Sequence, residues 1–155
     1  MKILKAAGIL FLVVFVAWSV NAEEIERTAK IMSITGGASV RLTGQEAWIT
    51  AEEGMVLNQG DIVKTGPESW VLLNVNGTGE TATVEVDSNS QLLMAQLLRD
   101  TEKGTESTLL DLAIGEILIT VEKIQTAEST FEVKTPTSTV GVRGTKFAVK
   151  VEAME

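Results

Sequence analysis

The sequence predicts an all-β domain, built as a short-stranded antiparallel β roll or sandwich or as a β-solenoid-like domain. The first observation is a period of two in the apolar residues, as in Thr81–Val86 and Lys146–Glu152. The second is the turn signals that separate short runs rich in Val, Ile and Thr, among them Gly36-Gly37, Gly66-Pro67 and Asn76-Gly77. Only two prolines interrupt the chain, which leaves most of these runs free to pair.

Each further run of this kind is expected to form a strand. These runs are Ala29–Ile34, Ser39–Leu42, Ala47–Ala51, Asp61–Thr65, Trp70–Val75, Thr108–Ile114, Glu116–Val121 and Thr130–Lys134.

The run Gln91–Arg99 is ambiguous, because it consists of good helix formers and follows two residues that can cap a helix, Asp87 and Ser88. The charged segment Arg99–Ser107 after it has the composition of a hairpin tip, and the apolar run Thr108–Ile114 follows. A pair of strands explains both runs together, so strand is predicted in preference to helix.

The chain contains a faint internal similarity. Gly60–Thr65 resembles Gly115–Thr120, and Glu68-Ser69 has a counterpart in Glu128-Ser129. Two interpretations remain open: a duplicated strand–turn–strand unit, as in a short solenoid, or chance similarity between two β-rich hairpins.

The N-terminal segment predicts export. Lys2 and Lys5 precede the uncharged apolar run Ala6–Val20, and Val20-Asn21-Ala22 fits the loose pattern that a signal peptidase reads. We expect residues 1–22 to be a cleaved signal peptide, in preference to a retained membrane anchor, and residues 23–155 to form one β domain. The protein is therefore expected to be periplasmic or secreted.

Composition narrows the classes of partner. The formal net charge is −8 and becomes −10 once Lys2 and Lys5 leave with the signal, which disfavours nucleic acid and anionic lipid as general partners. The chain has no Cys, so it carries neither disulfides nor a lipid-modified cysteine, and its core must hold it together.

Catalysis is not expected. The absence of His as well as Cys removes the usual general base, most zinc sites and the common nucleophilic triads. The many carboxylates alternate with apolar residues or crowd loops such as Glu52-Glu53, which is typical of a solvated surface rather than a catalytic pair. We predict no enzyme, no metal and no cofactor.

Three pattern matches do not support a ligand site, and the two around Gly77 are better explained as a hairpin turn. Gly77–Ala82 fits a dinucleotide-binding pattern, but a strand follows where a helix is needed. Asp87–Ser90 begins like a calcium loop, but Leu92 stands where that loop requires Gly. Asn76-Gly77-Thr78 is a formal glycosylation sequon and also a favoured hairpin turn.

The segment Phe131–Val149 is the most informative one. It reads as a strand stopped by Pro136, a polar connection, and a second strand entered through Gly141 and Gly144. Arg143 between these glycines has two interpretations: it binds groups of its own domain, or it contacts an external anion.

This segment also resembles the closing motif of the FecR domain family, with Thr135-Pro136, then Val142, Arg143, Gly144 and Thr145, then Phe147 and Val149. Upstream, Gly54–Gly66 is similar to the family's Gly-Asp segment, and Leu109–Ile117 is similar to its central Leu and Gly step. These matches occur in order along nearly the whole mature chain.

The resemblance implies an all-β, solenoid-like periplasmic domain without enzymatic residues. In the best-known members this domain belongs to transmembrane anti-sigma regulators that relay iron-siderophore uptake. Because no residues precede the signal segment here, we expect this chain to lack the cytoplasmic arm that holds a sigma factor.

The leading hypothesis is a non-catalytic protein-binding module of the cell envelope, with sheet edges, Trp48, Trp70 or Arg143 as candidate contacts. Large aromatic residues are usually well buried, so Trp48 and Trp70 are also candidates for half-buried strand positions. The alternatives are a glycan or small-ligand sensor, in which a Trp stacks on a sugar, and a purely structural envelope component that associates with itself.

Overall fold

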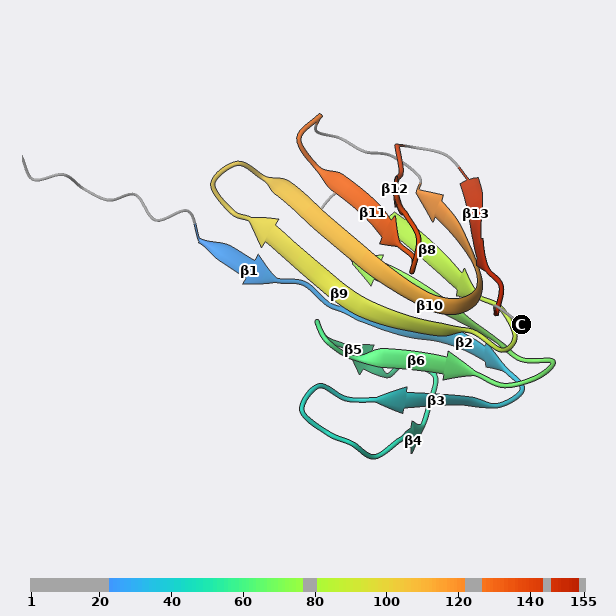
Figure 1. Cartoon of the computed structure of the whole chain (residues 1–155). Helices are drawn as coiled ribbons and strands as arrows, with labels where there is room; N and C mark the ends of the chain where they lie inside the picture. The colour runs from blue at the N-terminus through green and yellow to red at the C-terminus, as the bar shows by residue number, and fades with distance from the viewer. Residues whose placement is uncertain (1–22, 77–80, 122–126, 144–145, 154–155) are drawn as a thin grey trace, which may run out of the picture.

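A computed structural model describes residues 23–76, 81–121, 127–143 and 146–153. Within these ranges the chain forms β-strands joined by turns and contains no helix, so the all-β prediction is confirmed (Figure 1). The expected signal peptide, residues 1–22, lies outside the described residues. No helix in the described part is long and apolar enough to span a membrane.

The strands are β1 (Glu24–Glu26), β2 (Ala29–Thr35), β3 (Ala38–Arg41), β4 (Ile49–Thr50), β5 (Val56–Leu57), β6 (Ile62–Thr65), β7 (Trp70–Asn76), β8 (Thr81–Val86), β9 (Gln91–Asp100), β10 (Thr105–Val121), β11 (Thr130–Lys134), β12 (Thr139–Gly141) and β13 (Lys146–Val151).

All strands join one curved sheet that is centred on the 17-residue strand β10 (Figure 1). The main path is β4-β3-β6-β9-β10-β8-β7-β2-β5. Along one edge of β10, β9 pairs with the first part and β8 with the last part. Along the other edge, the first part pairs with β11 in parallel and the last part with β13 in antiparallel orientation. Strand β10 therefore belongs to both halves of the sheet.

Strand β10 changes its inward face just before Gly115. Before this residue the buried positions are even-numbered, as in Leu110 and Leu112, and after it they are odd-numbered, as in Ile117 and Ile119. Because a strand has a period of two, one extra residue is needed to keep both halves facing the same core. The register with β9 shifts between Leu112 and Ile114, which makes Ala113 the extra residue. Gly115 follows with a φ of 99°, in a region that glycine adopts readily.

The close approach of Ser90 also requires a glycine at position 115. A Cβ at this position would overlap the side chain and Cα of Ser90. Ser90 is 1 % exposed, and its Oγ accepts a hydrogen bond of 3.0 Å from the backbone N–H of Glu116. The bulge in β10 and the turn between β8 and β9 therefore pack closely and are joined by this hydrogen bond.

The core lies on the inner face of this curved sheet and is almost entirely aliphatic. Its largest fully buried side chains come from seven strands: Ile31, Val40, Leu57, Val63, Leu73, Leu92, Met94, Leu97, Leu110, Leu112, Ile117 and Ile119. Phe131 is the one aromatic residue in the buried set of the described residues. Full burial of one large aliphatic side chain contributes roughly 1.5–3 kcal/mol to the free energy of folding. The aliphatic core is therefore the main stabilising element of this chain, which has no disulfides.

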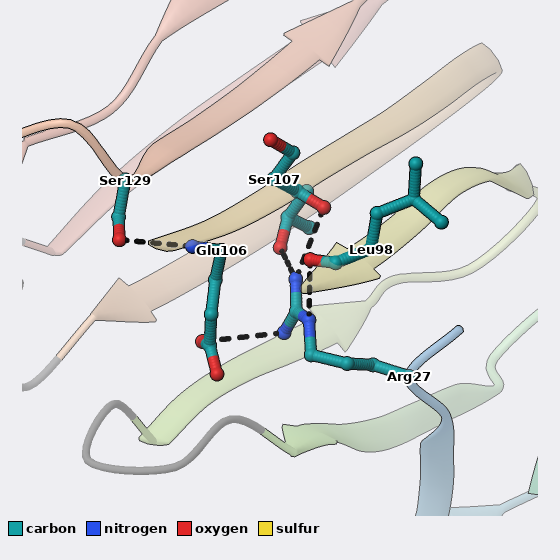
Figure 2. A network of polar contacts seen from close by, with 6 residues as sticks. Arg27, Leu98, Glu106, Ser107 and Ser129 are labelled. Carbon is teal, nitrogen blue, oxygen red and sulfur yellow. Dashed lines mark hydrogen bonds and ion pairs between the residues drawn. The ribbon is translucent and has the colours of Figure 1, made fainter. Parts of the chain in front are cut away.

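A buried arginine joins the N-terminal strands to the β9–β10 hairpin (Figure 2). Arg27 is 8 % exposed and donates through Nε to the carbonyl of Leu98 at 3.0 Å and through a terminal nitrogen to the carbonyl of Ser107 at 3.1 Å. It also hydrogen-bonds to Thr108 Oγ1 and forms an ion pair of 3.5 Å with Glu106. The backbone N–H of Glu106 in turn donates to Ser129 Oγ at 3.1 Å.

The internal similarity has a structural counterpart in three buried serines. Ser69, Ser90 and Ser129 each directly precede a strand, and each accepts a backbone N–H from another part of the chain, donated by Gly37, Glu116 and Glu106 respectively. Gly60 and Gly115, which the similarity also aligns, both have a positive φ and have no room for a Cβ. A buried serine before a strand that accepts a distant backbone N–H therefore occurs three times, whereas the internal sequence similarity aligns only Ser69 with Ser129.

Most expected strands are confirmed, including Gln91–Arg99, where strand was predicted against helix propensity. Three differences stand out. The expected strand Ala47–Ala51 is reduced to Ile49–Thr50, the runs Thr108–Ile114 and Glu116–Val121 are one continuous strand, and β1, β5 and β12 were not predicted. These three strands have two or three residues each, too few to show a period of two. The β10–β11 pair is parallel in an otherwise antiparallel sheet. The Asp87–Ser90 segment forms the turn between β8 and β9.

We predict that Gly115→Ala destabilises the protein by roughly 3 kcal/mol, because it adds both backbone strain and overlap with Ser90. The matched control is Gly104→Ala at the β9–β10 turn, where φ is 65° but nothing lies within 4 Å of the added Cβ; it should lose about 1 kcal/mol. Urea unfolding of both variants measures the difference, and equal losses would contradict the close-approach argument.

We predict that Arg27→Met destabilises the fold by about 3–5 kcal/mol, because it leaves the carboxylate of Glu106 buried without its cationic partner. The double variant Arg27→Met, Glu106→Met removes both charges and should be more stable than the single variant. Chemical denaturation of the two proteins tests this order, and a double variant weaker than the single one would show that the pair is not coupled.

Candidate binding groove

A groove lies where β11 and β13 meet along one edge of β10. Pairing with β11 ends at Asp111, which lies opposite Lys134, and pairing with β13 begins at Gly115, opposite Val151. The three β10 residues between these points, 112–114, have no strand partner on this edge. A groove of about 580 Å³ opens here, lined by Ala113 and Ile114, the turn 135–138, Val140, and residues 147–153.

The floor of the groove is apolar and open to solvent. Ile114 is 39 % exposed and Val140 is 37 % exposed. Phe147 is half-buried and packs against the core, and Val149 is 8 % exposed. Large apolar side chains that share one concave surface are typical of an interaction site rather than of isolated surface residues.

One wall is a turn that its own side chains hold in place. The hydroxyl of Thr135 accepts hydrogen bonds from the N–H groups of Ser138, at 3.1 Å, and Thr137, at 3.4 Å. The Thr135 N–H also donates to the Ser138 carbonyl at 2.8 Å. Pro136 restricts φ at the next position. The Thr-Pro pair of the sequence motif therefore builds a rigid wall for the groove.

Two strands with a free edge border the groove. Strand β12 pairs only with β11, and β13 pairs only with β10, among the strands of the described residues. Each free edge presents backbone N–H and C=O groups that another strand can pair with. Lys146 and Lys150 alternate along β13 with the inward residues Phe147 and Val149.

The charges at the rim are paired. Lys150 forms an ion pair of 3.0 Å with Glu152, and hydrogen bonding to this carboxylate raises the pKa of the lysine above its usual value. Lys134 lies 3.9 Å from Asp111. Both lysines are exposed. The rim thus has little net charge, which suits a partner that is recognised by shape and backbone pairing.

The predicted candidate residues do not gather at this groove. Arg143 is exposed and follows β12, and its guanidinium donates to the carbonyl of Ala127 at 3.3 Å, a group of its own domain. Val142 is 5 % exposed and its N–H donates to the carbonyl of Phe131 at 2.7 Å. Gly144 and Thr145 lie outside the described residues. The described part of the motif thus ties the chain after β12 to β11.

The two tryptophans lie on other strands. Trp70 begins β7 and is half-buried. Trp48 directly precedes β4, is 38 % exposed, and has the guanidinium of Arg41 and the ammonium group of Lys64 over its ring.

Ile114 and Val140, the two exposed residues on the groove floor, are not among the candidate residues that the sequence predicts. Ile114 ends an apolar run that is typical of a core strand, and only the register shift between Leu112 and Ile114 turns it outward. The available signal was the position of Gly115 directly after this run.

A comparison with known protein families identifies the family of this chain. The family model described as FecR protein matches residues 61–155. The chain belongs to the FecR family. FecR domains are generally signalling or regulatory domains. Comparisons with curated proteins and with solved structures give no match.

The match includes every residue of the groove and begins at Asp61. Asp61 has a clear structural role. It is 2 % exposed, and its carboxylate accepts hydrogen bonds of 2.8 Å from the N–H groups of Thr43 and Asn58. Asp61 of the Gly-Asp pair therefore joins the loop after β3 to the turn before β6. The part of the sequence resemblance from Gly54 to Gly60 lies upstream of the residues that the family model matches.

We predict that Thr135→Val destabilises the domain by about 1–2 kcal/mol, because it removes the acceptor of two backbone N–H groups. Thr137→Val is the control on the same turn; its exposed hydroxyl has no hydrogen bond within the described residues, and it should change stability by less than about 0.5 kcal/mol. Thermal unfolding of both variants provides the comparison. An unaffected Thr135→Val protein would contradict the proposed role of this hydroxyl.

Proposed function

We propose that this FecR domain is an exported, non-catalytic module that binds an extended segment of another envelope protein in the groove between β12 and β13. The observation that carries the proposal is the combination of two free strand edges with an exposed apolar floor. An extended segment can pair its backbone with a free edge and place alternate side chains in the groove.

The size and chemistry of the groove support this mode of binding. Ile114 and Val140 are more than one third exposed, so a bound side chain removes apolar surface from water at both residues. This gain is roughly 25 cal/mol per Å² of apolar area. Backbone hydrogen bonds along β13 then fix the orientation of the segment. The rigid Thr135–Ser138 turn needs little ordering when a partner binds, which lowers the entropic cost.

A signalling role in the envelope is supported by family membership and by the expected signal peptide. FecR domains are generally signalling or regulatory, and the basic and apolar pattern of residues 1–22 predicts export. We propose a periplasmic or secreted location on this basis.

A non-catalytic role is supported by chemistry. The sequence has neither His nor Cys. Among the described residues no group of three or more acidic side chains is placed to hold a metal ion. The groove itself is lined by one carboxylate, Glu152, which is paired with Lys150.

The test is site-specific photocrosslinking in intact cells. We expect p-benzoylphenylalanine at Ile114 or Val140 to crosslink to one envelope protein, which mass spectrometry identifies. The matched control is Val56 on β5, which is 50 % exposed at the β5 end of the sheet path and should not crosslink to that protein. Ile114→Asp should abolish the crosslink formed from Val140, while Val56→Asp should leave it unchanged.

Two results would count against the proposal. Equal crosslinking from Val56 and Val140 would mean that the groove is not selective. Crosslinks only between copies of this chain would favour a structural envelope component that associates with itself.

A further inference from the structure

A second surface, remote from the groove along the sheet path, has the composition of a ligand site. It lies on the solvent face of β4, β3 and β6, three neighbouring strands. Ser39 of β3 is opposite both Thr50 and Lys64, so these three residues form one row across the sheet. Val40 is fully buried on the other face, which places Ser39 and Arg41 outward.

Trp48 and two cations dominate this surface. The guanidinium of Arg41 lies 5.2 Å from the centre of the Trp48 ring, and the ammonium group of Lys64 lies 5.7 Å from it. No ion pair joins either cation to a carboxylate anywhere in the described residues, whereas Arg27, Lys134 and Lys150 each have one. In a chain with a net charge of −8, two cations that face an aromatic ring instead of an acid leave positive charge available to an anionic ligand.

A pocket of about 490 Å³ adjoins Trp48 and Lys64. Small residues and hydroxyl groups line most of it: Gly36, Gly37, Ala38, Ser39, Thr50, Ala51, Thr65 and Gly66. The hydroxyl of Thr65 donates a hydrogen bond to the carbonyl of Asp87. Those of Ser39 and Thr50 have no hydrogen-bond partner within the described residues, and Thr50 is exposed. The pocket thus offers free hydroxyls beside an aromatic ring.

These features select one chemical class of ligand. A volume of about 490 Å³ falls within the roughly 300–1,000 Å³ of small-molecule sites. The net negative charge of the protein repels a long polyanion. Charges more than about 8 Å apart are largely screened at physiological salt. A small anion at this site therefore interacts mainly with the two nearby cations, which attract it. Hydroxyl groups in the pocket suit a polyol, and the exposed part of an indole suits a sugar ring.

We infer that Trp48, Arg41 and Lys64 form a binding site for a small saccharide that carries a carboxylate. The carboxylate lies against Lys64 and Arg41, and the sugar ring lies over the pocket beside Trp48. This site shares no residue with the groove and does not depend on the proposed partner protein.

The test is binding of two matched disaccharides, cellobiouronic acid and cellobiose, which differ in one carboxylate. Calorimetry should show saturable binding of the acid and at least tenfold weaker binding of cellobiose. Lys64→Gln and Arg41→Gln should each weaken binding of the acid by about tenfold, since a charge-assisted hydrogen bond contributes that much. Trp48→Leu should weaken the binding of both sugars.

The charge control is Lys103→Gln in the β9–β10 turn, at the end of β9 away from Lys64. It removes the same charge and should leave binding unchanged, and circular dichroism establishes that every variant is folded. The inference is overturned if cellobiose binds as well as the acid, if Lys103→Gln is as harmful as Lys64→Gln, or if a tetraglutamate peptide binds as tightly as the acid. The last result would assign these cations to an acidic segment of a protein.

Discussion

The bulge at residues 113–115 of β10 is the constraint on which the rest of the structure depends. It shifts the inward face of β10 by one residue, so that one 17-residue strand contributes to the core along both halves. Without this shift, Ile117 and Ile119 would face solvent whenever Leu110 and Leu112 face the core. The same bulge separates β11 from β13 along one edge of β10 and turns Ile114 outward. The fold and the candidate groove therefore share a single cause.

The parts of the sheet are joined by buried polar groups that bind backbone. Asp61, Ser69, Ser90 and Ser129 are each at most 5 % exposed, and each accepts one or more backbone N–H groups. Arg27 does the same with backbone carbonyls. A buried N–H without a partner costs about 1–3 kcal/mol, so these side chains are needed wherever a turn leaves the ladder. They give a fold with a small aliphatic core and no disulfides a defined arrangement of turns.

The two proposed sites differ in their relation to the family. The groove lies entirely within the matched residues 61–155, and its wall is the Thr-Pro pair of the family motif. Of the saccharide site, Lys64 lies within the match, whereas Arg41 and Trp48 precede it. The sites lie on separate strands, so a protein and a small ligand can bind at the same time.

The sequence by itself determined the all-β class, most strand positions, the absence of His and Cys chemistry and the family motif, because a period of two and turn residues are local properties of the chain. It also predicted strand for Gln91–Arg99 against helix propensity, from the hairpin that follows. Only the tertiary structure decided the continuity of β10, the parallel pairing of β11 and the exposure of Ile114, because these depend on which distant strands meet. The grouping of Trp48 with Arg41 and Lys64 was equally invisible, since the three residues come from separate segments that only the register of β3 with its neighbours aligns.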